Sequence, residues 1–593
     1  MLTSTLLLRT APLQFSFGSF RRSLTHYESA LAYAFLGIIA GVLSGAAVIA
    51  FEHAIEHTAL LWGVGSRGDN FESLPALERF ALPLAGALIL GAAFSALQPE
   101  HRDVGIVHVI SRLYLHYGML PVRNAIVQFL GGVVALATGQ SGGREGPGVH
   151  LGAAINSIIG QRLGLPNTSL RILIACGSAG GIAAAFNTPL AGVIFTMEVI
   201  VSEYTVAGFV PVVLSAVVAS AMSHQLGGGA EIFEMSGVQL ASLWEIPYVM
   251  LLGLCCGTAS ALLIRLSTLS AKLTDRPVLL RFALAGLLTG SLALFVPEVL
   301  GIGYDTLGRA MFQELALQTL LVIALAKIVA TAVAVGFGMP VGLIGPTLLI
   351  GACIGGAAAL VGAPLLASQQ AMAFTIDPTL YVTVGMAATM GAVFGAPLAA
   401  CLAAIELTQS TSVAMPALLA IIIANLVNTS LFRQRSAHRS VLRQLLRRLP
   451  DDPLDQLLHR TDVNAVIDSS VVTLDRKLGS SVVSTLAVQV PNWCLIQREG
   501  ELLFLVSGNE LMEWVENSPS EGEDPDITEA TLRRWSIAVV PEQATLRQVL
   551  DILRARTVEA VAVYARAGQG KRILRGVVTR DRIERFALHS LNN

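Results

Sequence analysis

A charged pair lies between glycines in the segment 141–152, whose sequence is SGGREGPGVHLG. Glycines expose backbone N–H groups, and Pro147 suits the first turn of a following helix. The N-terminus of a helix attracts an anion through its free N–H groups and the positive end of its dipole. Glu145 is then a carboxylate tethered beside an anion site that it can occupy or leave, which predicts a gate. The alternative is that Glu145 only pairs with Arg144 or caps the helix.

A second turn, GLIGP at 342–346, repeats this helix start without a charge and could supply backbone donors to the same ion. It belongs to a longer internal repeat. Gly143, Gly146, Pro147 and Gly152 correspond to Gly342, Gly345, Pro346 and Gly351, each displaced by 199 residues, and Gln128 and Lys327 share that offset. Gly177, Ala179, Phe186, Pro189, Leu190, Ala191 and Glu198 correspond to Gly385, Ala387, Phe394, Pro397, Leu398, Ala399 and Glu406, each displaced by 208.

Close helix packing would explain isolated small residues, but two constant offsets indicate two sequential halves built on one plan. Such repeats are typical of transporters whose substrate site lies where the halves meet. The matches leave open whether the repeats run parallel or inverted.

Composition supports a membrane protein. Of the 593 residues, 53% are hydrophobic and 13% charged, with a mean hydropathy of +0.65, whereas soluble proteins carry about 25% charged residues. The net charge of -2 offers no basic patch suited to nucleic acid. We find no nucleophile with a base, no metal-binding cluster and no phosphate loop, so an enzyme is not expected.

Long apolar runs predict membrane-spanning helices, which need about 20 residues. They lie near 30–52, 81–97, 123–139, 205–223, 244–266, 279–298 and 317–336. Shorter or interrupted runs predict half-helices that meet inside the protein. These are 147–161, 170–186, 189–203, 344–363, 380–394 and 396–408.

The character of the chain changes after residue 430. A basic cluster follows, made of Arg433, Arg435, Arg439, Arg443, Arg447 and Arg448, and such clusters suit the cytoplasmic face of a membrane. Residues 454–593 predict a soluble α/β region, in which Thr545 caps a helix and the segments 560–564 and 574–579 form strands.

Three segments resemble the signatures of the CLC family of chloride channels and proton-coupled chloride transporters: GREGP at 143–147, GLIGP at 342–346 and AAAFNTPLAGVIF at 183–195. The resemblance covers nearly the whole chain. It implies a mainly α polytopic membrane protein of two repeated halves with broken helices, and a homodimer with a separate anion pathway in each subunit. It also implies Glu145 as the gating glutamate, flanked by Arg144 and Gly146, and backbone donors at Leu343 and Ile344.

Two departures from the family concern the anion site. The loop that carries the family's anion-contacting serine aligns here with Val104 and Gly105, so one hydroxyl donor is missing. The family's inner tyrosine is also absent, and the alignment places His438 or Ala437 there. His438 could donate to an anion or simply lie on the surface. A less enclosed site with weaker or broader anion selectivity is the resulting hypothesis.

A third departure concerns proton coupling. The family's internal glutamate aligns with Val199, which cannot relay a proton. Glu198 is adjacent, but one residue turns it about 100° around a helix. Its partner Glu406 in the other half suggests that both glutamates are structural.

The C-terminal region resembles a pair of CBS modules, which can bind adenine nucleotides. Ser507 and Glu510 fit the first module, with Glu where the family more often has Asp, and Thr579 fits the second, in which Asp581 comes one residue early. Arg582 stands where the family has a ribose-contacting acid, so a packing or dimerising role is a full alternative.

We therefore expect a cytosolic tail over 1–27, although this segment also resembles a transit peptide. A transport domain over 28–432 follows, with halves of about 28–225 and 244–432, then a basic linker over 433–453 and a CBS pair over 454–593. The expected location is the cell inner or plasma membrane, in contact with lipid, with both termini cytoplasmic.

The predicted function is transport of chloride or similar small anions as a channel or a loosely coupled chloride/proton exchanger. No cofactor is required, and nucleic acid is not a partner. The alternative is a membrane-anchored CBS nucleotide sensor without anion transport.

Overall fold

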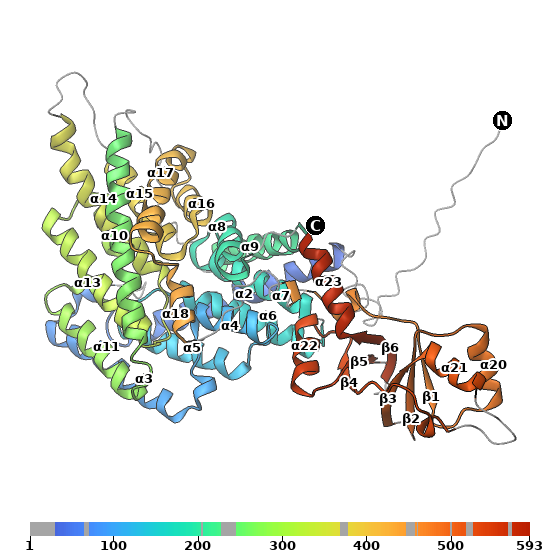
Figure 1. The fold of residues 1–593 in the computed structure, drawn as a ribbon. Coiled ribbons are helices and arrows are strands. Elements are labelled where there is room, and N and C mark those ends of the chain that lie inside the picture. The colour runs from blue at the N-terminus through green and yellow to red at the C-terminus, as the bar shows by residue number, and fades with distance from the viewer. Residues whose placement is uncertain are drawn as a thin grey trace, which may run out of the picture. The chain divides into compact units, whose positions relative to one another are not determined.

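The computed structural model describes residues 30–64, 70–165, 167–202, 206–226, 245–367, 377–445, 457–458, 461–498, 501–517, 526–566 and 572–592. The chain forms two compact units, one made of 1–165 and 169–449, the other of 166–168 and 450–593 (Figure 1). The expected N-terminal tail, together with Arg447 and Arg448 of the basic cluster, lies outside the described residues.

The first unit is helical, and its helices fall into two sets in the same order. The first half contains α2 (Ala30–Leu60), α3 (Ala76–Ala96), α4 (Gly105–Leu115), α5 (Val122–Ala137), α6 (Glu145–Arg162), α7 (Asn167–Phe186), α8 (Pro189–Phe195) and α9 (Val206–Leu226). The second half contains α10 (Ile246–Ala271), α11 (Val278–Ala293), α12 (Tyr304–Met311), α13 (Leu317–Gly336), α14 (Ile344–Ala367), α15 (Pro378–Phe394), α16 (Pro397–Thr408) and α17 (Ala414–Leu426), followed by α18 (Ala437–Leu445).

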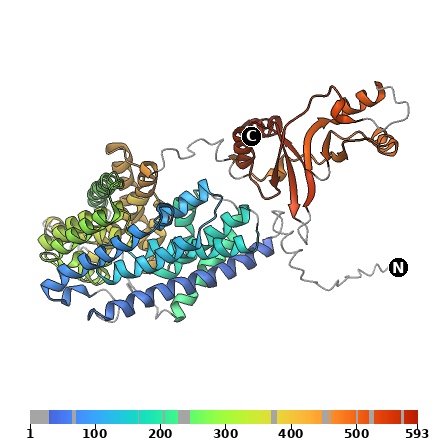
Figure 2. The ribbon, with the colours of Figure 1, turned by 90° about the horizontal axis from the view of Figure 1, so that it is seen from below.

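Eight helices in the described residues are long and apolar enough to cross a membrane. Large apolar side chains cover the outside of this unit, and Phe295 is 86% exposed, which suits contact with lipid. The long helix α2 runs along one side of the unit in the view of Figure 2. The chain is thus an integral membrane protein.

Most predicted runs coincide with a helix, and 317–336 matches α13 at both ends. Four expectations were wrong. The runs at 123–139 and 279–298, predicted to span the membrane, form helices of only 16 residues each, α5 and α11. Conversely, the runs at 170–186 and 344–363 are continuous helices of 20 and 24 residues rather than broken ones. The chain breaks before these helices instead. Four helices of this unit were not predicted: α4, α12 and α18 carry polar residues that dilute the apolar pattern, and the apolar run of α17 was overlooked.

The two halves meet at their glycine turns. The N–H of Gly143 donates to the carbonyl oxygen of Gly342 at 2.8 Å, and the N–H of Gly342 donates back to Gly143 at 2.7 Å, which forms an antiparallel bridge. Each half thus offers the other its equivalent residue, as a two-fold relation requires. The helices that follow, α6 and α14, therefore begin close together.

The second unit contains two modules of the same design. The first is β1 (Val471–Asp475), α20 (Ser480–Val488), β2 (Trp493–Arg498), β3 (Glu501–Ser507) and α21 (Gly508–Asn517). The second is β4 (Ile537–Pro541), α22 (Leu546–Ala555), β5 (Ala560–Arg566), β6 (Arg572–Thr579) and α23 (Arg580–Asn592).

Each module pairs its first two strands in parallel and its last two antiparallel, with a register shift in the antiparallel pair. Thr545 caps α22 in a capping box with Gln548, and the segments 560–564 and 574–579 lie in β5 and β6. These sequence predictions are confirmed, and the unit is α/β.

Close helix packing at one glycine gives a first prediction. A methyl group at Gly351 of α14 would overlap the carbonyl oxygen of Gly385 in α15. We expect Gly351→Ala to lower the free energy of unfolding by about 1–3 kcal/mol, as overpacking does. Thermal unfolding in detergent, followed by size-exclusion chromatography, measures this. Gly308→Ala in α12 is the matched control, because nothing lies within 4 Å of its added carbon; equal midpoints for the two variants would contradict the prediction.

Candidate functional site

The carboxylate of Glu145 bridges the two halves of the helical unit. Glu145 is the first residue of α6 and is fully buried. Its Oε2 atom accepts a hydrogen bond at 3.2 Å from the N–H of Gly345, in the first turn of α14. Its Oε1 atom accepts a hydrogen bond from the hydroxyl of Tyr304, the first residue of α12. A negative group therefore lies at the positive end of a helix from the opposite half.

Glycine is required where the two turns touch. A side-chain carbon at Gly146 would lie 2.7 Å from the Cα atom of Gly342, and one at Gly342 would lie 2.7 Å from the N atom of Gly146. Only residues without a side chain permit this approach. The close contact brings the starts of α6 and α14 together, so their unpaired N–H groups are concentrated in one place.

Arg144 contacts Glu52 and the ring of Tyr304. Its Nε atom lies 3.2 Å from Oε1 of Glu52 on α2, and its guanidinium lies over the ring of Tyr304 at 5.6 Å from the ring centre. Pairing of Glu145 with Arg144 alone does not describe the site, since both carboxylate oxygens of Glu145 have partners in the second half. Direct anion contact by Arg144 stays a prediction.

A cavity of about 320 Å³ lies beside the glycine turns and brings five predicted residues together. These are Val104, Gly105, Gly146, Leu343 and His438, which come from the starts of α4, α6, α14 and α18. Asp103, His108 and Ser111 also line it. Helix starts from both halves therefore face one hollow.

His438 does not lie on the surface, so that alternative is wrong. The side chain is 7% exposed, and its ring stacks on Phe394 with ring centres 5.2 Å apart. Its Nδ1 atom has no hydrogen-bond partner among the described residues. A buried donor or acceptor without a partner is costly, so this nitrogen is suited to meet a solute or water in the cavity.

The start of α4 differs from the expected donor loop in one respect. Val104 is extended and supplies no side-chain hydrogen bond, and the N–H of Gly105 donates to Oε1 of Gln128 at 2.7 Å. The same amide of Gln128 donates to the carbonyl oxygen of Pro340 at 3.2 Å. Gln128 thus fixes this loop against the second half, and the N–H of Gly105 is already occupied.

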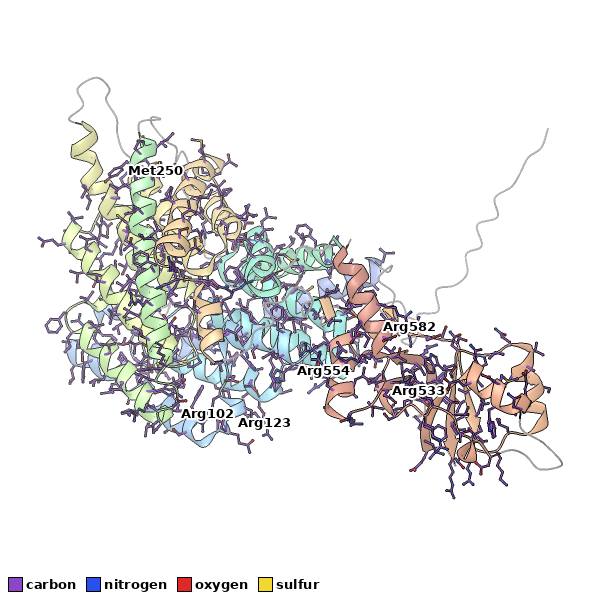
Figure 3. All side chains as sticks on the ribbon, viewed as in Figure 1. Arg102, Arg123, Met250, Arg533, Arg554 and Arg582 are labelled. Carbon is purple, nitrogen blue, oxygen red and sulfur yellow. The ribbon has the colours of Figure 1, made fainter. Side chains whose placement is uncertain are left out.

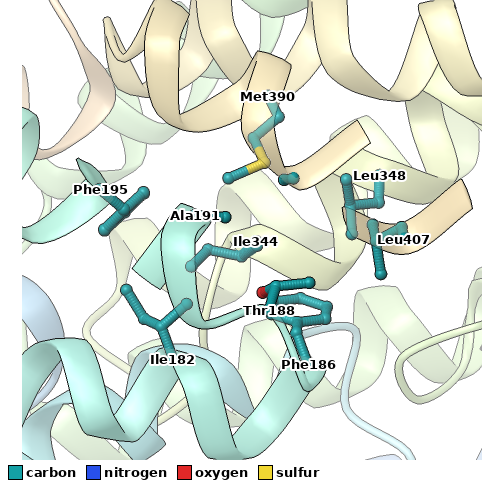
Figure 4. Close-up of a pocket in the computed structure, with 10 residues that line it drawn as sticks. Ile182, Phe186, Thr188, Ala191, Phe195, Ile344, Leu348, Met390 and Leu407 are labelled. Carbon is teal, nitrogen blue, oxygen red and sulfur yellow. The ribbon is translucent and has the colours of Figure 1, made fainter. Parts of the chain in front are cut away.

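The side chain of Ile344 lies in a separate, small apolar pocket of about 10 Å³ (Figure 4). Phe186, Thr188, Phe195 and Met390 line the same pocket. Such a volume holds one water at most. Ile344 therefore contributes its backbone to the start of α14, while its side chain fills space between the halves.

Glu198 and Glu406 each accept hydrogen bonds from a helix start in the opposite half. Glu198 accepts from the N–H groups of Leu398 and Ala399 at 3.3 and 3.0 Å, at the start of α16. Glu406 accepts from Leu190 and Ala191 at 2.8 Å each, at the start of α8. These bonds support the structural role that we expected. Val199 is buried in the π-helical turn Thr196–Val201.

The sequence analysis did not predict that Tyr304 belongs to the site. Its only available signal was its position after Gly301-Ile302-Gly303, a second short turn before a helix. Gly303 has a φ of +89°, and Gly105, the corresponding glycine at the start of α4, has a φ of +73°. A search of the repeat at this turn would have drawn attention to the next residue.

The predicted nucleotide residues lie at the ends of strands in the C-terminal unit. Ser507 ends β3 and Thr579 ends β6, while Glu510 and Asp581 lie in the first turns of α21 and α23. Arg582, which Figure 3 marks on this unit, binds Asp468 at 2.8 Å through Nη1. That ion pair ties α23 to the segment before β1, which favours packing at this position.

Comparison with known proteins decides the family. The family model described as voltage gated chloride channel matches residues 86–429, more than half of the chain. The chain belongs to the CLC family. Within it, a ClcB-like protein of Ralstonia nicotianae is 32% identical over 400 residues, covering 66% of this chain and 91% of that protein.

Other CLC proteins resemble the chain over similar lengths. The H(+)/Cl(-) exchange transporter ClcA of Vibrio cholerae is 29% identical over 441 residues, covering 70% of this chain and 90% of ClcA. Among solved structures, a slow cyanobacterial Cl-/H+ antiporter has a TM-score of 0.61 at 23% identity, covering 70% of this chain and 98% of that one. A eukaryotic CLC transporter has a TM-score of 0.53 at 20% identity, covering 95% and 98%. These two structures share the CLC fold.

The crossed glutamate caps give a second prediction. We expect Glu406→Ala to lower the free energy of unfolding by about 1–2 kcal/mol, because two N–H groups of α8 lose their acceptor and the helix dipole loses its negative partner. Glu406→Gln should cost less, since an amide oxygen can still accept one bond. Thermal unfolding in detergent measures both variants. Glu314→Ala, at an exposed carboxylate, is the control, and a smaller loss for Glu406→Ala than for this control would refute the capping role.

Proposed function

We propose that this CLC protein carries chloride or similar small anions across a membrane, through a separate pathway in each subunit of a homodimer, and that Glu145 gates each pathway. The observation that carries the proposal is the bond between Glu145 Oε2 and the N–H of Gly345. A carboxylate bound to a helix start occupies a place that a halide would find equally favourable. Leaving that place would admit the ion.

The chemistry of the surroundings favours an anion over a cation. Starts of α6 and α14 converge there, and helix starts present N–H donors and positive dipole ends. His438 lines the cavity next to them, and its Nδ1 atom has no hydrogen-bond partner within the described part of the chain. Leu343 directly precedes α14 and Ile344 is its first residue, so neither backbone N–H group has an intrahelical acceptor.

Coupling to protons is proposed to be loose or absent. Val199 carries no titratable group, and Glu198 is engaged at the start of α16. Both exchangers and channels occur among the relatives by name. We infer a channel or a loosely coupled exchanger that needs no cofactor, with both termini on the cytoplasmic side, because Arg433, Arg435 and Arg439 follow the last long helix.

Nucleotide binding by the C-terminal unit stays a prediction for Ser507, Glu510, Thr579 and Asp581. Among the residues of this unit that the structure describes, no contact favours a nucleotide sensor as a second function. Asp581 is exposed and lies 3.9 Å from Arg585, four residues on in the same helix, which is an ordinary surface pair.

Replacing the gate gives a third prediction. In protein reconstituted into liposomes, Glu145→Ala should increase chloride efflux at neutral pH by about tenfold or more, because the competing carboxylate is gone. Any chloride-driven proton uptake should be abolished in the same variant. Chloride electrodes and a pH electrode record the two fluxes.

Glu56→Ala on α2 is the control for this experiment, since Glu56 is a partly exposed carboxylate that pairs with His53. Wild-type behaviour in both fluxes for Glu145→Ala would remove the gating role. Absence of anion flux in the wild-type protein would remove the proposed function itself.

The missing hydroxyl gives a fourth prediction. Val104→Ser places a donor at the cavity beside the start of α4, and we expect it to tighten chloride binding about fivefold, the effect of one hydrogen bond worth about 1 kcal/mol. Isothermal titration with chloride measures the affinity. Val107→Ser, at another residue that lines the same cavity, controls for added polarity, and equal affinities in the two variants would contradict a specific role for position 104.

A further inference from the structure

Both oxygens of the Glu145 carboxylate are held, but by different kinds of group. The backbone of Gly345 holds Oε2 and the side chain of Tyr304 holds Oε1. A backbone donor is fixed in the protein, whereas a phenol hydroxyl is a single, removable contact. Tyr304 is therefore the side chain whose identity can tune how firmly the gate is shut.

The ring of Tyr304 is itself confined by its neighbours. The guanidinium of Arg144 lies over it at 5.6 Å, a distance at which a cation is attracted to a ring face. The ring of Phe186 meets it edge to face, with ring centres 6.4 Å apart and an angle of 61°. Arg144 is anchored in turn by Glu52. The hydroxyl is thus aimed at Glu145 by packing from α7 and from the start of α6.

Lys327 on α13 binds the backbone that precedes Tyr304. This fully buried side chain donates from Nζ to the carbonyl oxygens of Gly301 at 2.8 Å and Val299 at 3.1 Å. Gln128, its counterpart in the first half, fixes the loop before α4 by accepting from Gly105. Lysine has no acceptor, so it binds carbonyl groups instead. The loop that ends at Gly303 and Tyr304 is therefore as firmly placed as the loop at Val104.

We propose that Tyr304 is a latch on the gate: its hydroxyl stabilises the ionised, docked form of Glu145 and sets how much acid or anion is needed to release it. The proposal rests on the proposed anion transport and extends it to regulation of the same site. A hydroxyl bonds more strongly to a carboxylate than to a neutral carboxyl group. Loss of the bond therefore favours the protonated, undocked form.

The charged and titratable groups around Glu145 come from several elements. Arg144 precedes it on the same turn, Glu52 faces that arginine from α2, Tyr304 comes from α12, and Lys327 lies on α13 behind the loop. Arg144 and Lys327 favour the ionised carboxylate and Glu52 opposes it. None of the three changes when Tyr304 is altered, so a change in pH dependence would report the hydroxyl.

Tyr304→Phe tests the latch by removing one oxygen atom. Chloride efflux from liposomes at pH 7 should rise about tenfold, and the pH of half-maximal activation by acid should move upward by about one unit, the effect expected for one bond to a charged group. In a Glu145→Ala background the same substitution should change nothing. Tyr248→Phe is the matched control, because that hydroxyl donates to the carbonyl oxygen of Ala358 elsewhere in the unit.

Replacement of Tyr304 by 3-fluorotyrosine keeps the shape of the ring and makes the hydroxyl a stronger donor. The latch then predicts the opposite change, with slower efflux at pH 7 and acid activation at lower pH. This variant also serves if Tyr304→Phe does not fold, which size-exclusion chromatography detects.

Three results would overturn the latch while leaving anion transport intact. One is a wild-type pH profile for both variants in a protein whose efflux depends on Glu145. Another is an equal effect of Tyr304→Phe in the Glu145→Ala background. The third is slower efflux with weaker chloride binding in Tyr304→Phe, which would make the hydroxyl a ligand of the ion. If the wild-type protein did not transport chloride, that result would instead contradict the proposed function.

Discussion

Two backbone hydrogen bonds between Gly143 and Gly342 hold the site together. They join equivalent points of the two halves, and every other feature of the site follows from that contact. Because the two halves touch there, the first turns of α6 and α14 lie close together. Glu145 of one half therefore reaches the N–H of Gly345 in the other. Larger residues at Gly146 or Gly342 would push the turns apart. The anion chemistry is thus a product of close backbone contact.

Reciprocal contacts between the two halves also occur away from the glycine turns. Glu198 and Glu406 exchange identical contacts with helix starts of the opposite half. Gln128 and Lys327 occupy equivalent positions but bind different groups, because an amide can accept while an ammonium cannot. Equivalent positions that keep the same residue, such as Glu198 and Glu406, therefore join the two halves. Equivalent positions that differ, such as Gln128 and Lys327, bind the different groups found in each half.

Most of the frame could be predicted from the sequence, because constant offsets between matched residues reveal the repeat without any knowledge of contacts. Glu145 was predicted as the gate for a similar reason, since Arg144 and Glu145 are charged where apolar residues are expected. Tyr304 was not found, because its role depends on a contact across 159 residues of chain. The sequence left His438 between two alternatives, because its Arg-rich neighbours suggest exposure while the structure buries it against Phe394. Burial and long-range contact are properties of the fold that local composition does not encode.

The crossed caps of Glu198 and Glu406 have a mechanical consequence. Many transporters with repeated halves alternate by rocking one half against the other, but here such a movement would pull two carboxylates from the N–H groups of α8 and α16 and would break the bridge at Gly143. The halves are held together by these contacts and by the bond from Gln128 to Pro340. The gate that we propose, Glu145, is a single side chain at their junction, so its opening needs only rotation about side-chain bonds and leaves these contacts between the halves in place.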